Sequence, residues 1–558
     1  MMSTDRGQGE RSPTAVAVLV ATACIFYGGV SAIGIAQAWR HHELIGFLLQ
    51  AVVLLPVLWW AWTRTGLAAP TDALVSDRVA RGAIVLFVLV AAGLSWHVTQ
   101  GMLINDENAY RFQAETLVRG SLFAPNPHGA PLAPERPPRA LLFTHAIYTE
   151  HGWAFHFPIG WPLVLALPET LGISWLLNPV LGGVLLLLTW TVTRELFGGA
   201  VAPAAVVIAA LSPYLLGNLV GIMSHGASGV LVAGATLLFI RGVRSGRLGP
   251  FVLMLALLAI CIQIRLLTGA IAAAILGCAA LVMTRDRPRL CLGIAGASAV
   301  LGGLAVAGVL ASNAAITGSP LLSPYALSRG LTENAGIVAG LSQIGHNLIG
   351  SYRGAAQATI LYAFPLVILL AGYGYWKTRR QVPEGNVLVL LLVGLVLGHL
   401  IQSEPFSSVS GERYWFEAYF GVAALAAVGL HRWVAEHRPA RQVVQVSAAG
   451  IVLAQLALGG ATAVKLDRLS QPQRAFLDAA RQFEGCQCAL FLSIPEPFFA
   501  QHFILNRPDW PDRSVFFFTD PGPGERVEWA QRFGKERWAA LRYDPSIRKA
   551  VVDDEGSL

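Results

Sequence analysis

The stretch GAIVLFVLVAAGLSWHVTQGMLINDENAYRFQA, residues 82–114, indicates how the chain is placed relative to a membrane. Its first part, 82–101, contains no Asp, Glu, Lys or Arg. It is long enough to cross the hydrocarbon core of a bilayer, which takes roughly 17–25 apolar residues. Its second part turns polar and carries the adjacent acids Asp106 and Glu107. We therefore predict a transmembrane helix that ends directly before an acidic segment at the membrane surface.

The rest of the chain repeats this apolar pattern. Of its 558 residues, 54% are hydrophobic and only 13% are charged. A soluble domain carries about 25% charged residues, so a chain of this composition cannot cover a water-soluble surface. The mean hydropathy is +0.56, and the charges cluster between apolar blocks, as in loops that separate membrane spans. The composition predicts an all-α polytopic membrane protein.

The apolar runs predict about thirteen transmembrane helices. They lie near 13–37, 44–62, 82–101, 175–193, 200–217, 223–240, 250–267, 269–284, 291–311, 356–376, 386–403, 414–431 and 442–460. The run 269–284 is short for a span, and the run 160–171, which contains Pro162 and Pro168, is shorter still. We expect 160–171 to form an interfacial or re-entrant helix rather than a span.

The basic residues are distributed unevenly between alternate loops. With the N-terminus in the cytoplasm, four Arg- and Lys-rich clusters fall in cytoplasmic loops, at 241–247, 285–289, 377–380 and 432–441. This asymmetry follows the positive-inside rule and supports an odd number of spans. The segments 102–159, 312–355 and 402–413 then lie on the outer face, together with the C-terminal tail. The net charge of +7 is explained by this topology and by contact with anionic lipid, without a nucleic-acid partner.

The composition divides the chain into two parts. Residues 1–464 contain all the apolar spans and form the predicted transmembrane domain. Residues 465–558 alternate strand-like apolar runs with helical patterns. This alternation predicts a small α/β domain outside the membrane.

Ionisable residues stand where apolar spans meet the outer loops. Asp106 and Glu107 would lie at headgroup level, where a partly desolvated carboxylate can act as general base on a hydroxyl, although an acid there can also cap a helix. Arg265 and Arg413 lie at the outer ends of two other spans. Arg binds phosphate oxygens in a fork, although it can also snorkel to lipid headgroups. The two arginines and the acidic pair, at the same membrane depth, predict an outer cavity that binds an anion beside a base. His225 is a third polar residue at the outer end of a span, where a lone histidine fits a structural role as well as a functional one.

The order of motifs along residues 85–435 resembles the GT-C superfamily of membrane glycosyltransferases. This class includes dolichyl-phosphate-mannose-type protein mannosyltransferases and the aminoarabinose transferase of lipid A. The resemblance rests on Asp106-Glu107, Pro158-Ile-Gly-Trp-Pro-Leu-Val-Leu-Ala-Leu167, Leu177-Asn-Pro-Val-Leu-Gly182, Arg194-Glu-Leu-Phe-Gly198, Leu211-Ser-Pro-Tyr214, Asn313-Ala-Ala-Ile-Thr-Gly-Ser-Pro320 and Gly411-Glu-Arg-Tyr414. Each motif is loose alone, and it is their order and topology that match. Two spans precede the one that leads into the acidic loop, where many relatives have none.

The resemblance implies transfer of a sugar from a polyprenyl-phosphate donor to a glycan, lipid or protein acceptor. By this likeness Asp106 is the general base or the carboxylate that orients the acceptor, with Glu107 as the alternate. Arg265 and Arg413 would stabilise the leaving phosphate, and a single displacement would invert the anomeric centre. Substrate contacts are assigned to four further residues: Tyr110, His156, His225 and Tyr414. No cofactor is required, but a divalent metal is left open, with Asp106, Glu107 and His225 as candidate ligands.

Two other functions fit a chain of this kind. A transporter or flippase of lipid-linked glycans should show polar residues near the middle of the membrane and broken helices. A non-catalytic scaffold would explain the outer tail, but not edge arginines beside an acidic loop. The charges gather instead at the outer edge, which favours an enzyme in the bacterial inner membrane with its C-terminal domain in the periplasm. The sequence does not name the sugar, the acceptor or the oligomeric state.

Overall fold

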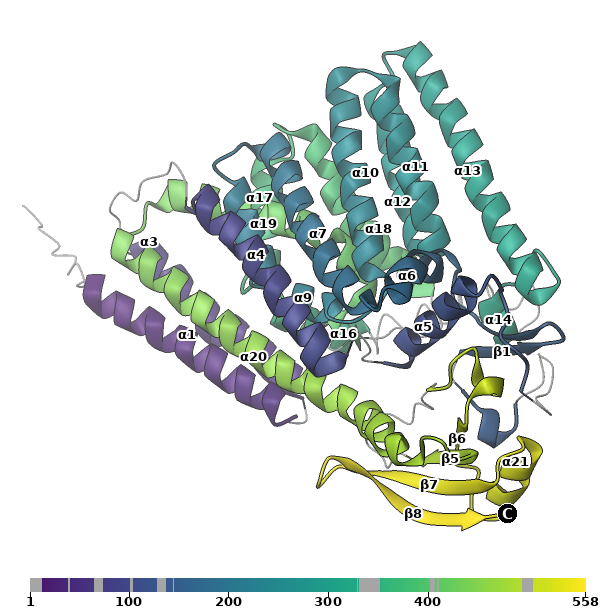
Figure 1. Cartoon of the computed structure of the whole chain (residues 1–558). Coiled ribbons are helices and arrows are strands. Elements are labelled where there is room, and N and C mark those ends of the chain that lie inside the picture. The colour runs from purple at the N-terminus through teal and green to yellow at the C-terminus, as the bar shows by residue number, and fades with distance from the viewer. Residues whose placement is uncertain are drawn as a thin grey trace, which may run out of the picture.

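The computed structural model of the chain describes residues 13–38, 41–64, 74–100, 104–127, 137–143, 145–328, 330, 352–401, 407–408, 411–493 and 505–558. These residues form a large helical bundle with a small sheet at one end (Figure 1). Most of the second predicted outer loop beyond residue 328, and residues 402–406 of the third, lie outside the described residues. The predicted fold class, an all-α polytopic membrane protein with a small C-terminal α/β domain, is confirmed.

Nine helices in the described part of the chain are long and apolar enough to cross a membrane. They are α1 (Pro13–Ala36), the continuous run of α2 (His42–Leu48), η1 (Leu49–Leu54) and α3 (Leu55–Arg64), α4 (Asp77–Leu94) with η2 (Ser95–Thr99), α7 (Ser174–Phe197), α10 (His225–Ser245), α12 (Leu266–Met283), α13 (Pro288–Thr317), η7 (Arg413–Ala418) with α19 (Tyr419–His437), and α20 (Arg441–Ala480) with η8 (Arg481–Phe483). Two bent helix pairs raise the number to eleven. Two shorter apolar helices, α11 (Leu248–Ile264) and α18 (Asn386–Gly398), coincide with the predicted spans 250–267 and 386–403. The count of thirteen stays a prediction.

The bent pairs differ from the straight spans that hydropathy predicts. The predicted span 200–217 is α8 (Ala202–Ala210) followed by α9 (Pro213–Leu219) at an angle of 64°, and 356–376 is α16 (Tyr352–Tyr362) followed by α17 (Val367–Thr378) at 89°. A proline lies at each break, Pro213 and Pro365, and proline cannot continue the hydrogen-bonding of a preceding helix. At the first break Ser212 caps α9 by accepting a hydrogen bond from the Leu215 amide. Hydropathy shows an apolar run but not the bend within it.

A small layer of short elements covers one end of the bundle. It contains α5 (Asn105–Val118), η3 (Arg139–Leu141), the antiparallel hairpin of β1 (Ala146–Thr149) and β2 (Gly152–Phe155), α6 (Gly160–Thr170), α14 (Pro324–Ser328), η6 (His399–Ile401), and the short strands β3 (Ser407–Ser408) and β4 (Gly411–Glu412). The short helix η5 (Pro383–Gly385) lies at the other end of the bundle, where Glu384 pairs with Arg244 of α10. The helix expected at 160–171 is present and is too short to span a bilayer. The long α20 runs beside α1 and leads out of the bundle to this end (Figure 1).

The C-terminal part is a four-stranded sheet with the strand order β6-β5-β7-β8. Its elements are β5 (Cys488–Ser493), η9 (Trp510–Asp512), β6 (Val515–Thr519), α21 (Arg526–Arg532), β7 (Arg537–Asp544) and β8 (Lys549–Ser557). Strand β5 pairs in parallel with β6 and β7, and β8 pairs antiparallel with β7. The helix α20 passes the predicted boundary at residue 465 without a break, so the chain enters this domain as a helix.

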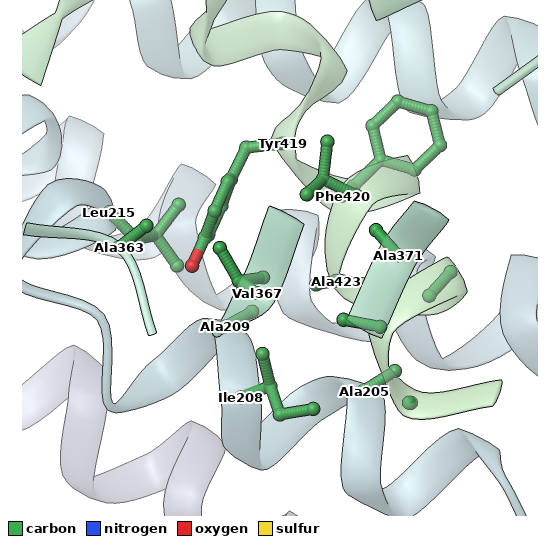
Figure 2. Packing of buried hydrophobic residues seen from close by; sticks show 14 of the residues in the cluster. Ala205, Ile208, Ala209, Leu215, Ala363, Val367, Ala371, Tyr419, Phe420 and Ala423 are labelled. Carbon is green, nitrogen blue, oxygen red and sulfur yellow. The ribbon is translucent and has the colours of Figure 1, made fainter. Parts of the chain in front are cut away.

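Two hydrophobic clusters hold these layers together. Inside the bundle, α8, α17 and α19 approach closely because the residues between them are small, among them Ala209, Ala371 and Ala423 (Figure 2). At the end of the bundle, Phe112 of α5 and Trp153 of β2 share a buried cluster with Phe518 of β6. Because the sheet packs on α5, the C-terminal domain is joined to the helix that carries the acidic pair.

Candidate active site

A cavity of about 360 Å³ opens where α5 meets the ends of the membrane helices. Six of the eight residues that the sequence singled out line it: Asp106, Tyr110, His156, Arg265, Arg413 and Tyr414. They come from α5, from the segment after β2, from the junction of α11 and α12, and from the start of η7. The structure thus brings together residues more than three hundred positions apart in the chain.

Asp106 lies in the first turn of α5 and is held from two sides. Its Oδ2 accepts a hydrogen bond from Nη1 of Arg413 at 3.0 Å, and its Oδ1 lies 3.1 Å from Nε2 of His145. Burial by itself raises the pKa of this carboxyl, but the charge of Arg413 and the contact with His145 outweigh burial and hold the pKa well below its usual range. Asp106 is therefore an ionised acceptor on the cavity wall.

Arg265 forms a second ion pair one layer deeper. Its Nε lies 3.0 Å from Oε1 of Glu417, a carboxylate that is fully buried in η7. The same oxygen accepts a hydrogen bond from Oγ of Ser228 at 2.6 Å. A buried charge is costly unless it is paired, so Glu417 keeps the Arg265 guanidinium at the cavity. Arg265 itself stands between α11 and α12, where the backbone is not helical.

The ring of Tyr414 lies between the two arginines. The guanidinium carbons of Arg265 and Arg413 are 5.5 and 5.4 Å from its centroid, within the range of cation–π attraction. The His399 ring stacks on Tyr414 with centroids 4.8 Å apart, and His399 Nε2 lies 3.2 Å from Oγ1 of Thr268. This arrangement fixes two cations at one wall of the cavity, which suits an anion with several oxygens.

Aromatic side chains also line the cavity. Tyr110 packs against Phe157 with ring centroids 4.5 Å apart, and burial together with the nearby Asp106 charge raises the pKa of Tyr110 to about 12. Nδ1 of His156 lies 2.7 Å from Oγ of Ser328, and its ring meets the ring of His145 edge-on at 4.5 Å. Hydroxyl and imidazole groups beside flat rings can bind a sugar by hydrogen bonds and stacking.

Glu107 and His225 are not among the described residues that line the cavity. Oε2 of Glu107 accepts a hydrogen bond from the backbone amide of Ile104 at 3.0 Å, so this carboxylate caps the start of α5. Its side chain also packs against Gly221, where any larger residue would collide with it. His225 is buried, with Nδ1 3.7 Å from Oε1 of Glu417. Both residues support the residues at the cavity from behind.

Three residues of the site were missed by sequence reasoning: His145, Glu417 and His399. His145 lies in an irregular segment with a positive φ of 74°, which no periodic pattern marks. Glu417 did carry a signal, because it is an acid inside the apolar run that follows Arg413. His399 ends an apolar span in the same way.

Asp106, Glu107 and His225 were the candidate ligands of a divalent metal. Among the described residues, no three His, Cys, Asp or Glu side chains are grouped so that they could hold a metal ion. Asp106 instead contacts Arg413 and His145, and Glu107 faces its own helix start. These three side chains do not form a ligand set.

The overall structure is similar to that of apo ArnT from Cupriavidus metallidurans, with a TM-score of 0.50 and 15% identity over 84% of this chain and 94% of ArnT. The chain has a GT-C fold. The structure of ArnT bound to undecaprenyl phosphate also aligns over 84% of this chain and 94% of ArnT, at 15% identity and with a TM-score of 0.49. Archaeal oligosaccharyltransferase AglB from Archaeoglobus fulgidus, in complex with an inhibitory peptide and a dolichol-phosphate, aligns at 0.43 and 11% identity, over 83% of this chain and 69% of AglB.

No protein-family model matches the sequence, and no curated protein matches it. The GT-C resemblance expected from the motifs is thus confirmed at the level of the fold. The roles of individual residues rest on the geometry of the cavity described above.

Proposed function

We propose that this protein is a glycosyltransferase that moves a sugar from a polyprenyl-phosphate donor to an acceptor hydroxyl. The observation that carries this function is the position of Asp106, an ionised acceptor beside two arginines on the wall of one cavity. A carboxylate next to a cationic wall suits a reaction in which a hydroxyl attacks and a phosphate leaves. The GT-C fold is consistent with this chemistry, although a fold alone does not specify an activity.

The reaction would be a single displacement at the anomeric carbon. The acceptor oxygen forms a bond to that carbon as the bond to the phosphate oxygen breaks, and the electron pair leaves with the polyprenyl phosphate. Arg265 and Arg413 stabilise the charge on the phosphate. Asp106 accepts the hydrogen bond of the acceptor hydroxyl and then its proton, so the anomeric configuration is inverted.

The donor would loosen the pair of Asp106 and Arg413. A phosphate at the cationic wall competes with Asp106 for Arg413. Because Arg413 is the main charge that lowers the pKa of Asp106, sharing it makes the carboxylate a better base. Glu417 lies behind the wall and keeps Arg265 in place throughout.

The proposed location is the outer face of the bacterial inner membrane. The Arg- and Lys-rich clusters of α10, α12, α17 and α19 lie at the ends of these helices remote from the C-terminal sheet (Figure 1). By the positive-inside rule that end is cytoplasmic, so the cavity and the C-terminal sheet face outward. Partners of this site are a polyprenyl-linked sugar and a glycan, lipid or protein acceptor.

The test is transfer by purified protein in detergent or liposomes. Wild-type protein, Asp106→Asn and the matched control Glu107→Gln are incubated with a panel of polyprenyl-phosphate sugars and a membrane extract as acceptor, and released polyprenyl phosphate is measured. We expect release by wild type, a loss of roughly 100-fold or more in Asp106→Asn, and a near-normal rate in Glu107→Gln, whose amide oxygen can still cap α5. Thermal unfolding confirms that each variant is folded.

Two outcomes contradict the proposal in different ways. Full activity in Asp106→Asn with loss in Glu107→Gln removes the role of Asp106 and assigns it to Glu107. Movement of a labelled lipid-linked sugar across liposomes without any release of polyprenyl phosphate indicates a transporter or flippase instead.

A further inference from the structure

A second cavity of about 490 Å³ lies between α3, α8, α17, α19 and α20. Its walls are almost entirely apolar, and their main side chains are Leu58, Trp59, Ile208, Leu370, Trp433 and Ile451. Its size falls within the roughly 300–1,000 Å³ typical of ligand pockets. Unlike the first cavity, it contains no candidate for catalysis.

The bend between α16 and α17 leaves this space open. Phe364, Pro365 and Leu366 line the cavity at the point where the chain turns by 89°. Beside the cavity, α8, α17 and α19 pack closely through small residues (Figure 2). Because these side chains are short, they do not extend into the cavity. The remaining walls come from α20 and from α3, which belongs to the two spans that precede α4.

The cavity lies at the opposite end of the bundle from the proposed active site. Arg413 begins the run of η7 and α19, and Trp433 lies near the other end of that run. Twenty helical residues span roughly 30 Å, about the thickness of the hydrocarbon core. The donor bound at Arg413 would therefore have its phosphate at the other membrane face.

Aromatic rings mark the rim as a membrane interface. The rings of Trp59 and Trp433 lie 4.6 Å apart, those of Tyr373 and Trp433 lie 5.5 Å apart, and His437 stacks on Trp433 at 4.2 Å. Trp and Tyr are enriched at headgroup level because one part of each ring system is apolar and the other is polar. The cavity thus opens at the depth where a phospholipid chain joins its headgroup.

The same rim is strongly basic. The end of α17 and the residues after it, the last turns of α19, and the turn that leads into the start of α20 carry Lys377, Arg379, Arg380, Arg432, Arg438 and Arg441. Glu436, an acid in the last turns of α19, pairs with Lys377 at 2.8 Å. Basic pockets between membrane helices on the cytoplasmic side suit anionic headgroups.

We propose that this cavity binds one acyl chain of an anionic phospholipid of the cytoplasmic leaflet, with the lipid phosphate against Arg380 and Arg432. The acyl chain would fill the apolar space between the described helices, and the headgroup would offset the excess positive charge of the rim. The bound lipid joins α3 to α17, α19 and α20. It therefore gives the N-terminal spans a role in holding the bundle together, whatever reaction the first cavity performs.

The experiment uses full-length protein that has been delipidated in detergent. Phosphatidylglycerol or phosphatidylcholine with identical acyl chains is added back, and bound lipid is counted by native mass spectrometry alongside the thermal unfolding temperature. We expect phosphatidylglycerol to be retained and to raise the unfolding temperature in a concentration-dependent way, with a clearly smaller effect of phosphatidylcholine.

Three variants separate the chain site from the headgroup site. Ala448→Trp fills the cavity, and Ala449→Trp is its matched control, because Ala449 is the next residue of α20, is exposed, and is not among the lining residues. We expect Ala448→Trp to lose the response to phosphatidylglycerol and Ala449→Trp to keep it. Arg380→Gln/Arg432→Gln leaves the packing intact and should weaken phosphatidylglycerol binding roughly 10- to 30-fold.

The proposal is overturned by equal retention of the two lipids in wild type, or by an undiminished response in Ala448→Trp. It is also overturned if polyprenyl phosphate displaces phosphatidylglycerol at stoichiometric amounts, since that result would give the cavity to the donor lipid. The double arginine variant decides the case if Ala448→Trp does not fold: phosphatidylglycerol binding as strong as in wild type would reject the proposed headgroup contact.

Discussion

Nη1 of Arg413 donates a hydrogen bond to Oδ2 of Asp106 at 3.0 Å, across 307 positions of the chain. Both side chains are largely withdrawn from solvent, with exposures of 15% and 11%. A buried pair of this kind contributes little when intact but costs much when one partner is removed, because the other charge is left without compensation. The pair therefore links the start of η7 to the start of α5.

We expect Arg413→Gln to destabilise the protein by about 3–5 kcal/mol, since it leaves the Asp106 carboxylate buried beside His145 but without its arginine partner. Adding Asp106→Asn removes that charge and should recover part of the loss, with a coupling of roughly 0.5–3 kcal/mol in a double-mutant cycle. Thermal unfolding in detergent measures all four proteins. Strict additivity would show that the two side chains do not interact.

The pH dependence of stability follows from the same pair. Because burial is outweighed by Arg413 and His145, the pKa of folded Asp106 lies below that of the unfolded chain, which is about 3.9. A lowered pKa gives stability that is fully present above the unfolded pKa and is lost as the pH falls through the folded pKa. Ionisation of Asp106 should therefore cause no loss of stability between about pH 5 and pH 8.

The low pKa of Asp106 should also determine how the rate of transfer depends on pH. In wild type we expect no acid limb from Asp106 above about pH 5. In Arg413→Gln the pKa of Asp106 rises, because burial is no longer opposed by the arginine charge, and an acid limb should appear at higher pH. Superimposable pH profiles of the two proteins would contradict the assignment of the low pKa to Arg413.

The Glu417–Arg265 pair predicts rescue by ligand. In Glu417→Gln the Arg265 guanidinium loses its carboxylate partner, and we expect a loss of about 3–5 kcal/mol in the unliganded protein. A phosphate in the cavity can replace the missing charge. Polyprenyl phosphate should therefore raise the unfolding temperature more in Glu417→Gln than in wild type, whereas His225→Gln, which keeps the carboxylate, serves as the control. Equal shifts in all three proteins would place the phosphate away from Arg265.

The amides of Asn108 and Gln473 exchange two hydrogen bonds, at 3.0 and 3.2 Å, between α5 and α20. Both residues are buried. We expect Asn108→Leu alone to cost about 1–3 kcal/mol because it leaves the Gln473 amide without this partner, and Asn108→Leu/Gln473→Leu to be less destabilised than Asn108→Leu. Thermal unfolding tests this order, and a double variant worse than either single one contradicts it.

Transfer by the same variants tests how far α20 positions α5. Asn108 is two residues from Asp106, so loosening its contact should lower kcat with little change in the KM of the donor, whose phosphate is bound by Arg265 and Arg413, which belong to other elements than α5. A change in KM alone would show that the contact acts on donor binding instead.

Local hydropathy accounts for most of the fold that the sequence predicted. The hydropathy of about twenty consecutive residues is enough to predict a span. Because unpaired backbone groups are costly in lipid, such a run forms a helix whatever other segments pack against it. The runs 82–101 and 175–193 therefore became α4 with η2 and α7. The short apolar run 160–171 became α6. In the C-terminal part the strand-like apolar runs 489–494, 514–518 and 538–543 correspond to β5, β6 and β7, whereas β8 was not expected, because 549–557 is too charged to read as a buried strand.

The site was predicted where a residue type was anomalous in its local context. Asp106, Arg265 and Arg413 were found because a charge at the edge of an apolar span is costly and needs a reason. His145 was missed because a histidine in an irregular segment is not anomalous. Glu107 looked equivalent to its neighbour, since sequence shows adjacent acids but not that one caps α5 and the other faces a cavity.

The sequence by itself determined that the chain lies in a membrane, where its spans run, and which end of the bundle carries unusual charges. These properties depend on the transfer of short segments from water to lipid, which is a local quantity. Only the tertiary structure decided that Asp106 pairs with Arg413 and Arg265 with Glu417, and that α16 and α17 bend apart around an apolar cavity. These features depend on contacts between segments far apart in the chain, and no local pattern of residues records which segments meet.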